Sequence, residues 1–85
     1  MTTAKIFYFY IVRCADNSLY SGITTNLKRR VGEHNSKKLG AKYTRGKQPV
    51  QLIHYEKFSS KSAAMKREWE VKKLTKKEKE LLLAL

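Results

Sequence analysis

A run of aromatic and β-branched residues near the N-terminus limits the folds that this chain can adopt. The segment from Ile6 to Arg13 reads Ile-Phe-Tyr-Phe-Tyr-Ile-Val-Arg, a composition that strongly favours a β-strand. Turn-forming residues follow at Ala15-Asp16-Asn17, and Leu19 to Ile23 is predicted to form a second short strand. The two strands are therefore expected to pair as a hairpin.

The rest of the chain is predicted to form three helices and one further strand. Thr24 or Thr25 can cap the first helix, and Ser59-Ser60 can open the second. Thr75 and Glu78 have the spacing of a capping box at the start of a leucine-rich last helix. After the hairpin, the expected elements are a helix over 26–36, a strand over 50–58, a helix ending near 73 and a helix from 75.

This order of elements, ββαβαα, predicts the α+β class, with a small three-stranded, mostly antiparallel sheet flanked by three helices. The chain has 85 residues, which is enough for one domain over residues 1–85 with a modest core. Any binding surface and any active site would therefore have to share this one fold.

The chain is strongly basic, with 19 Lys and Arg against 7 Asp and Glu and a formal net charge of +12. Such an excess destabilises the folded state through self-repulsion, which a polyanionic partner would relieve. Because basic side chains that neutralise phosphates release counterions, we expect nucleic acid as the partner, and DNA before RNA. The alternative is a generically basic protein without such a partner.

Cys14 is the only cysteine, which excludes a disulfide within the chain and a cysteine-rich zinc site. The apolar run from Ile6 to Val12 is too short to span a membrane and lacks the layout of a signal peptide. We therefore expect a cytoplasmic protein that has no membrane partner and no small-molecule cofactor.

Two glutamates of the second predicted helix, Glu68 and Glu70, are expected to have different environments. At 100° per residue, Glu68 falls inside an apolar arc, and Glu70 falls among lysines, where solvated ion pairs form. The arc comprises Ala64, Met65, Trp69 and Val71. Because an unpaired inward carboxylate is costly, Glu68 is predicted either to form a buried ion pair or to act as a metal ligand or catalytic acid.

In the first predicted helix, Arg30 and His34 lie one turn apart, beside the apolar side. Such a pair could face a phosphate group together. The alternative is that both lie at the boundary of the core and extend into solvent. Lys28 and Arg29 are expected to point toward solvent or phosphate.

The predicted hairpin carries three tyrosines, of which Tyr8 and Tyr10 share a face because strand side chains alternate. A three-residue loop at Ala15-Asp16-Asn17 would pair Tyr10 with Gly22, place Tyr20 on the same face and leave open space above Tyr10. A two-residue loop would put Tyr20 on the other face. Core packing is the alternative role for these aromatic residues.

No two of the seven carboxylates have an obvious two-metal spacing, which argues against a two-metal nuclease site. A single Mg²⁺ held by one carboxylate, waters and a substrate phosphate remains possible. The basic loop over 37–48 is a candidate clamp on nucleic acid, because Tyr43 can stack on an exposed base, and a solvated loop is the alternative. The clamp residues are Lys42, Tyr43, Thr44 and Arg45.

Together these residues resemble the GIY-YIG nuclease superfamily, and in particular its short, single-domain bacterial branch. Tyr8-Phe9-Tyr10 resembles the first signature, and Tyr20-Ser21-Gly22 resembles the second. Arg30 occupies the position of the family's helix arginine, and His34 matches a position with His or Tyr. Glu68 matches the metal-binding glutamate. The resemblance runs from about residue 7 to residue 74.

The resemblance implies a metal-dependent endonuclease that hydrolyses phosphodiester bonds in nucleic acid. It implies Tyr10, Tyr20, Arg30 and His34 as catalytic residues, and Glu68 as the ligand of one Mg²⁺ or Mn²⁺ ion. Either tyrosine could be the general base. A non-catalytic nucleic-acid-binding module on the same fold is the main alternative, and a scaffold that docks on an acidic partner is a third.

Overall fold

The computed structural model describes residues 5–36 and 39–84 and has the predicted α+β architecture. Its sheet has the strand order β2-β1-β3, and both pairings are antiparallel. The strands are β1 (Phe7–Arg13), β2 (Leu19–Thr24) and β3 (Gln51–Phe58). The helices are α1 (Leu27–His34), α2 (Lys61–Lys72) and α3 (Lys76–Leu83), with a short 3₁₀ helix, η1 (Lys42–Thr44), between α1 and β3. The ββαβαα order is confirmed.

The turn between β1 and β2 sets the register of the hairpin. The backbone N–H of Cys14 donates to the carbonyl of Ser18 at 2.8 Å, and Asn17 adopts a left-handed conformation with φ of 70°. Asparagine tolerates this region better than most residues. Tyr10 consequently pairs with Gly22. This is the register of the three-residue loop, so of the two alternatives that the sequence left open, the one in which Tyr10 and Tyr20 share a face is correct.

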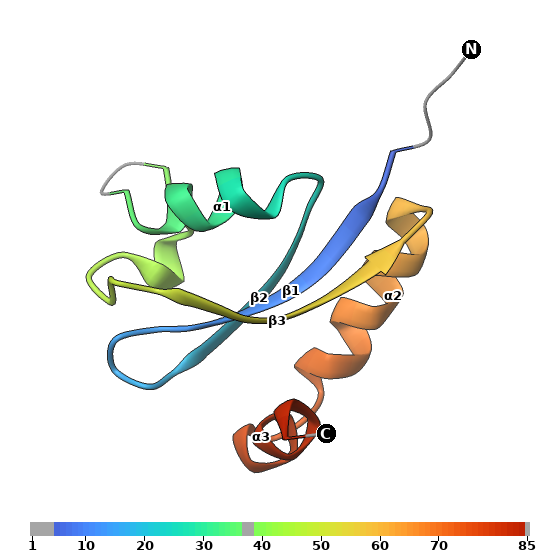
Figure 1. Ribbon diagram of the computed structural model, residues 1–85. Helices are drawn as coiled ribbons and strands as arrows, with labels where there is room; N and C mark the ends of the chain where they lie inside the picture. The colour runs from blue at the N-terminus through green and yellow to red at the C-terminus, as the bar shows by residue number, and fades with distance from the viewer. Residues whose placement is uncertain (1–4, 37–38, 85) are drawn as a thin grey trace.

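Helices cover both faces of the sheet (Figure 1). On the face of Tyr10 and Val12, the core includes Leu27 and Val31 of α1. On the opposite face, Phe9 and Ile11 of β1 pack with residues of α2, α3, the connection between them and the other strands. Those partners are Val71, Leu74, Leu82, Leu83, Leu19, Ile53 and Phe58. The central strand β1 is therefore buried on both sides, which explains its almost uniformly apolar sequence.

Side-chain caps begin all three helices. Ser60 accepts from the backbone of Ala63, and Thr75 with Glu78 forms a capping box, as predicted. The cap of α1 was predicted wrongly, because Asn26 accepts from the N–H of Arg29 at 3.0 Å. The Thr24 hydroxyl instead accepts from the Asn26 N–H at 3.1 Å, which fixes the entry to the helix.

The buried side of α2 differs from the predicted apolar arc. Ala64 and Val71 are fully buried, but Met65 and Trp69 are exposed by 51% and 61%. The stripe that meets the sheet instead includes Arg67, and Glu68 lies beside it, both half-buried. Arg67 can lie there because its charge is paired, whereas Trp69 lies outside with the ammonium of Lys73 3.3 Å from its ring centroid. Glu68 is therefore at the edge of the buried stripe rather than within it.

Two bidentate ion pairs attach the C-terminal helices to the sheet. Arg67 of α2 bonds both carboxylate oxygens of Glu56 on β3, at 2.9 and 3.2 Å. Arg13 of β1 bonds both oxygens of Glu80 on α3, at 2.8 and 2.7 Å. Across the part of the chain that is described, no helix is long and apolar enough to cross a membrane.

Candidate active site

A buried chain of hydrogen bonds joins β1, α1 and η1. The hydroxyl of Tyr10 lies 2.8 Å from Nε2 of His34, and Nδ1 of His34 lies 2.9 Å from the hydroxyl of Thr44. His34 and Thr44 are fully buried, and Tyr10 is 1% exposed. His34 is thus held from both ring nitrogens. The expectation that it would extend into solvent, which its helix position alone allowed, is wrong.

The hydrogen bonds of Thr44 determine the tautomer of His34. The Thr44 hydroxyl donates its single hydrogen to the carbonyl of Ala41 at 3.0 Å, so it can only accept from the imidazole. Nδ1 of His34 therefore carries the proton, and Nε2 offers its lone pair to the Tyr10 hydroxyl, which donates. The result is a neutral imidazole with its basic nitrogen directed at a phenol.

The electrostatic surroundings keep this pair in the neutral form. Burial lowers the pKa of His34, and the positive charge of Arg30 lowers it further, against a smaller opposing effect of Glu33. Burial raises the pKa of Tyr10, although the guanidinium of Arg30 offsets part of that rise. At neutral pH, Tyr10 is therefore a hydrogen-bond donor, and His34 is the neutral acceptor of its hydrogen bond.

Arg30 lies beside Tyr10 at the edge of the site. Its side chain is 26% exposed, and Nη1 donates to Glu33 at 2.8 Å and to the carbonyl of Leu39 at 3.2 Å. Burial acts to lower the pKa of Arg30, but Glu33 and Tyr10 outweigh it and raise the pKa above its ordinary value. Arg30 therefore remains a fixed, partly exposed cation beside the buried phenol.

Tyr20 completes the aromatic wall on this face of the sheet. Its ring packs edge-on against His34 with centroids 5.2 Å apart, and it stacks on Tyr43 of η1 at 5.6 Å. The ammonium of Lys47 lies 3.8 Å from the Tyr43 ring centroid. Tyr20 is half-buried, whereas Tyr10 is enclosed. The two phenols therefore differ in access to solvent as well as in hydrogen bonding.

Glu68 reaches the same site from α2, which packs against β1 and β2. Its carboxylate is among the groups that raise the pKa of Tyr10, as is the phenol of Tyr20. Its side chain is 23% exposed, and its ion-pair partner is Lys72, one turn along the helix at 3.3 Å and itself 55% exposed. Glu70 is 47% exposed and lies 3.9 Å from Arg67, which matches its predicted surface position.

A metal at Glu68 would take most of its ligands from water and substrate. The described residues contain no group of three or more His, Cys, Asp or Glu side chains that could hold a metal ion. Zn²⁺ normally requires three or four such ligands. Mg²⁺ is commonly held by one or two carboxylates together with waters and substrate phosphates. A single carboxylate whose partner is an exposed, displaceable lysine fits the second kind of site.

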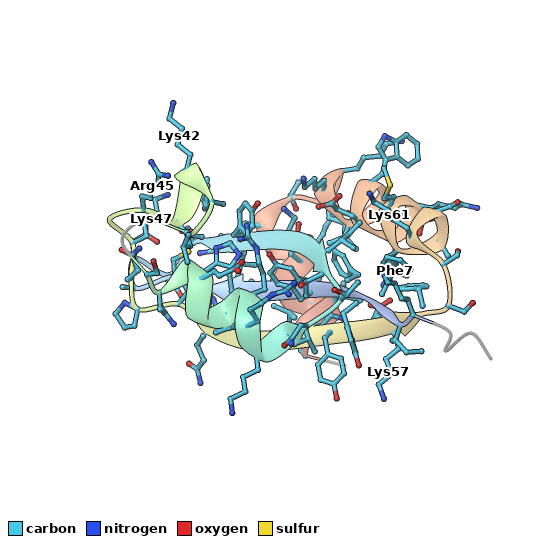
Figure 2. The ribbon with its side chains drawn as sticks, turned by 90° about the horizontal axis from the view of Figure 1, so that it is seen from above. Phe7, Lys42, Arg45, Lys47, Lys57 and Lys61 are labelled. Carbon is cyan, nitrogen blue, oxygen red and sulfur yellow. The ribbon has the colours of Figure 1, made fainter. Side chains whose placement is uncertain are left out.

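The residues predicted to contact nucleic acid fall into two groups. Lys28, Arg29, Lys42 and Arg45 are exposed. Figure 2 shows Lys42 and Arg45 at one end of the molecule, together with Lys47. Thr44 was expected on the binding surface and is instead fully buried against His34. Tyr43 is 43% exposed, but its ring already meets Tyr20 and Lys47.

Sequence reasoning missed the structural roles of two residues that hold the site together. Thr44 fixes the tautomer of His34 from ten residues away, a relation that no local pattern reveals. Glu56 on β3, through its ion pair with Arg67, anchors the helix that carries Glu68. Its alternation with His54 on one strand face was visible in the sequence, and His54 Nε2 indeed lies 2.7 Å from Glu56.

Solved structures of similar chains share this fold. The solution structure of protein EF2693 from E. faecalis is 49% identical, with a TM-score of 0.64 over 99% of this chain and 88% of that chain. The UPF0213 protein BH0048 from Bacillus halodurans is 47% identical, with a TM-score of 0.61 over 93% of this chain and 83% of that chain.

Curated relatives match over most of their length. A UPF0213 protein of Natronomonas pharaonis is 57% identical over 77 residues, which cover 91% of this chain and 89% of the relative. The UPF0213 protein YazA of Bacillus subtilis is 53% identical over 76 residues, covering 89% and 76%. The model of the GIY-YIG catalytic domain matches residues 6–81, a span that contains the hairpin tyrosines, Arg30, His34 and Glu68. This chain therefore belongs to the GIY-YIG family, which is a nuclease superfamily.

Proposed function

We propose that this protein is a metal-dependent endonuclease that hydrolyses phosphodiester bonds in nucleic acid, with DNA as the first substrate to test. The observation that carries the proposal is the 2.8 Å hydrogen bond between the Tyr10 hydroxyl and Nε2 of a neutral, buried His34. A general base must present a lone pair at a fixed place, and this arrangement supplies one. Membership of the GIY-YIG family supports nucleic acid as the substrate.

The Tyr10–His34 pair provides a route for the proton of the attacking water. As the water oxygen bonds to phosphorus, its proton passes to the Tyr10 oxygen, while the Tyr10 proton passes to Nε2 of His34. The P–O bond to the leaving group breaks, and the leaving oxygen takes a proton from solvent. After the product leaves, His34 returns its proton to Tyr10 as the Tyr10 proton passes to solvent, which restores the neutral pair. Tyr10 receives a proton from the water as it gives its own proton to His34, so no free phenolate has to exist beforehand. This suits a phenol whose pKa is raised by burial. Tyr20, half-exposed beside His34, would orient the water.

Arg30 stabilises the charge that develops on the phosphate. Its guanidinium stays charged and presents several N–H donors in a fixed plane, a geometry that matches two phosphate oxygens. One of these donors is already bound to Glu33, which fixes the side chain before substrate arrives. Removal of a preorganised donor of this kind typically costs about 10²–10³ in rate.

Glu68 would hold the single Mg²⁺ or Mn²⁺. The ion supplies Lewis-acid stabilisation of the phosphate and of the leaving oxygen. Within the protein, the contribution of Glu68 is a carboxylate at the edge of the site that is close enough to influence Tyr10. Lys72 can turn away on its long side chain when a cation binds.

The first experiment is a cleavage assay with single-stranded, duplex and branched DNA and RNA, with Mg²⁺, Mn²⁺ or EDTA. We expect cleavage only with metal. Tyr10→Phe should reduce kcat by about 10²–10⁴, because it removes the group that passes the proton. Tyr20→Phe should reduce it less and should leave the pH profile unchanged. Tight binding without cleavage of any substrate would instead favour a non-catalytic binding module on this fold.

A further inference from the structure

A pocket beside the candidate active site shares Arg30 with it and extends to Lys61 of α2. It has a volume of about 360 Å³ and lies between the end of the edge strand β2, the first turn of α1 and the start of α2. This volume is at the lower end of the range for small-ligand pockets, about 300–1,000 Å³. It suits one nucleotide unit rather than a duplex. Arg30 lines it, so the pocket continues directly from the site at Tyr10.

The charged side chains that line this pocket are all cations. Arg29 and Arg30 come from α1, and Lys61 comes from α2. The carboxylate of Glu33 lies 2.8 Å from Arg30 and 3.8 Å from Arg29, but Glu33 does not line the pocket. One carboxylate therefore balances two guanidiniums, and Lys61 adds a further positive charge. An anion is the ligand that this electrostatic arrangement favours.

Lys61 brings an exposed positive charge to the pocket from α2. It forms no ion pair with any carboxylate in the described part of the chain. It occupies the first position of α2, whose first turn has no acidic residue, although a cation there interacts unfavourably with the helix dipole. Figure 2 shows Lys61 near Phe7, at the opposite end of the molecule from Lys42, Arg45 and Lys47. A phosphate in the pocket would balance this charge.

The uncharged walls of the pocket suit the sugar that accompanies a phosphate. Phe7 and Ile23 provide apolar surface, and Thr24 and Thr25 provide hydroxyls. The Thr24 hydroxyl is bound to the backbone of Asn26, whereas Thr25 is exposed and can donate to an anion. The pocket thus combines cations, one available hydroxyl and an apolar wall.

We propose that this pocket binds the phosphate and sugar of the nucleotide next to the scissile phosphate, with Lys61 as its principal contact. The proposal rests on the proposed endonuclease function, because it places a neighbouring nucleotide of the same bound strand. Lys61 positions the strand and touches no reacting atom. It therefore contributes to binding substrate rather than to the chemical step.

The test compares Lys61→Gln with Lys66→Gln, which makes the same charge change on the exposed surface of the same helix. Affinity is measured by fluorescence anisotropy with a labelled oligonucleotide in EDTA, so that no cleavage is needed. We expect Lys61→Gln to weaken binding about threefold to tenfold and to reduce the slope of log K against log salt by about 0.7–0.9, the value for one phosphate. Lys66→Gln should change neither.

A second measurement locates the phosphate. A neutral methylphosphonate is placed at each phosphate that flanks the cleavage site in turn. At one position it should weaken binding to the wild type as much as Lys61→Gln does, and it should have no further effect on the Lys61→Gln variant. In cleavage assays, the same variant should raise KM with little change in kcat.

The proposal is overturned if Lys61→Gln and Lys66→Gln weaken binding equally, or if every methylphosphonate effect adds fully to that of Lys61→Gln. A protein that binds with the expected Lys61 dependence but never cleaves would contradict the endonuclease function and leave the phosphate pocket supported. A protein that cleaves nucleic acid but whose binding does not depend on Lys61 would support the endonuclease function and contradict the phosphate pocket.

Discussion

The Cα atom of Gly22 lies against the hydroxyl of Tyr10, its cross-strand neighbour. A Cβ atom at residue 22 would approach the Tyr10 oxygen to 2.6 Å and the adjoining ring carbon to 2.9 Å, closer than real contacts allow. The phenol therefore occupies the space that the missing side chain leaves, and this contact helps to direct it at His34. The backbone of Gly22 is not in a left-handed conformation, so backbone strain does not require glycine at this position. The neighbouring Tyr10 ring requires it instead.

Gly22→Ala tests this contact. The added methyl group must displace the Tyr10 ring, and overpacking of this kind costs about 1–3 kcal/mol of stability. The hydrogen bond to His34 should break, so cleavage should fall by about 10²-fold or more even where the variant remains folded. Thermal unfolding and kcat are measured on the same samples.

Gly32→Ala is the matched control. Gly32 lies in α1, where an added Cβ would meet no atom within 4 Å. Alanine should stabilise the helix by about 0.5–1 kcal/mol and leave cleavage unchanged. A Gly22→Ala protein with wild-type activity would show that the position of the Tyr10 hydroxyl is unimportant.

The stability of the fold should depend on pH through His34. The unfolded side chain titrates near 6.5, and burial lowers the pKa in the folded protein, with Arg30 contributing. The folded state therefore binds fewer protons, so its stability is complete above about pH 6.5 and declines as the pH falls toward the lowered pKa. The slope for one proton is at most about 1.4 kcal/mol per pH unit.

Urea unfolding between pH 8 and 5 measures this effect in the wild type and in His34→Gln. Carboxylates such as Glu33 and Glu56 have pKa values lowered from 4.5, so they titrate below this window. The slope should be present in the wild type and absent in the variant. Equal slopes would mean that His34 is not held neutral. Cleavage should also fall on the acid side, because protonated His34 cannot accept from Tyr10.

The Arg67–Glu56 ion pair should control the response to metal. Burial acts to raise the pKa of Glu56, but Arg67 and His54 outweigh it and hold the carboxylate ionised. Arg67→Met leaves Glu56 half-buried without this partner and should let α2 shift, which moves the adjacent Glu68. We expect the Mg²⁺ concentration for half-maximal cleavage to rise about 10-fold, the lower end of the range for groups that support metal ligands.

Arg13→Met is the control for that variant. It breaks the comparable bidentate pair with Glu80, which holds α3 rather than α2. This variant should lose stability without a change in the Mg²⁺ dependence. If both variants raise the Mg²⁺ requirement equally, the effect is general destabilisation and Arg67 has no specific role in positioning Glu68.

Local patterns were enough to predict the elements, whereas they left two registers open for the hairpin. The strand composition, the turn residues and the capping box act over a few residues, and the structure confirms them. The prediction of the apolar arc of α2 was wrong because a helical wheel contains no information on the width of the contact between helix and sheet. Met65 and Trp69 lie outside it, while Arg67 is drawn in by Glu56, a partner eleven residues earlier.

The site was harder to predict because its contacts span the chain. The positions of Tyr10, Arg30 and Glu68 came from the resemblance to a family, since their meeting depends on three separate elements. The burial of His34 depends on Tyr10, 24 residues before it, and on Thr44, ten residues after it. One local feature of the sequence distinguished Lys61: it is a basic residue at the start of a helix, where the helix dipole favours an acidic residue.

The most direct test of the proposed nuclease compares Glu68→Ala with Glu70→Ala, two truncations in the same turn of α2. Mg²⁺-dependent cleavage and binding in EDTA are measured for both against the wild type. Glu68→Ala should abolish cleavage and keep its affinity for nucleic acid, whereas Glu70→Ala should retain both. Equal cleavage by the two variants would contradict the assignment of Glu68 as the metal ligand, and with it the proposed mechanism.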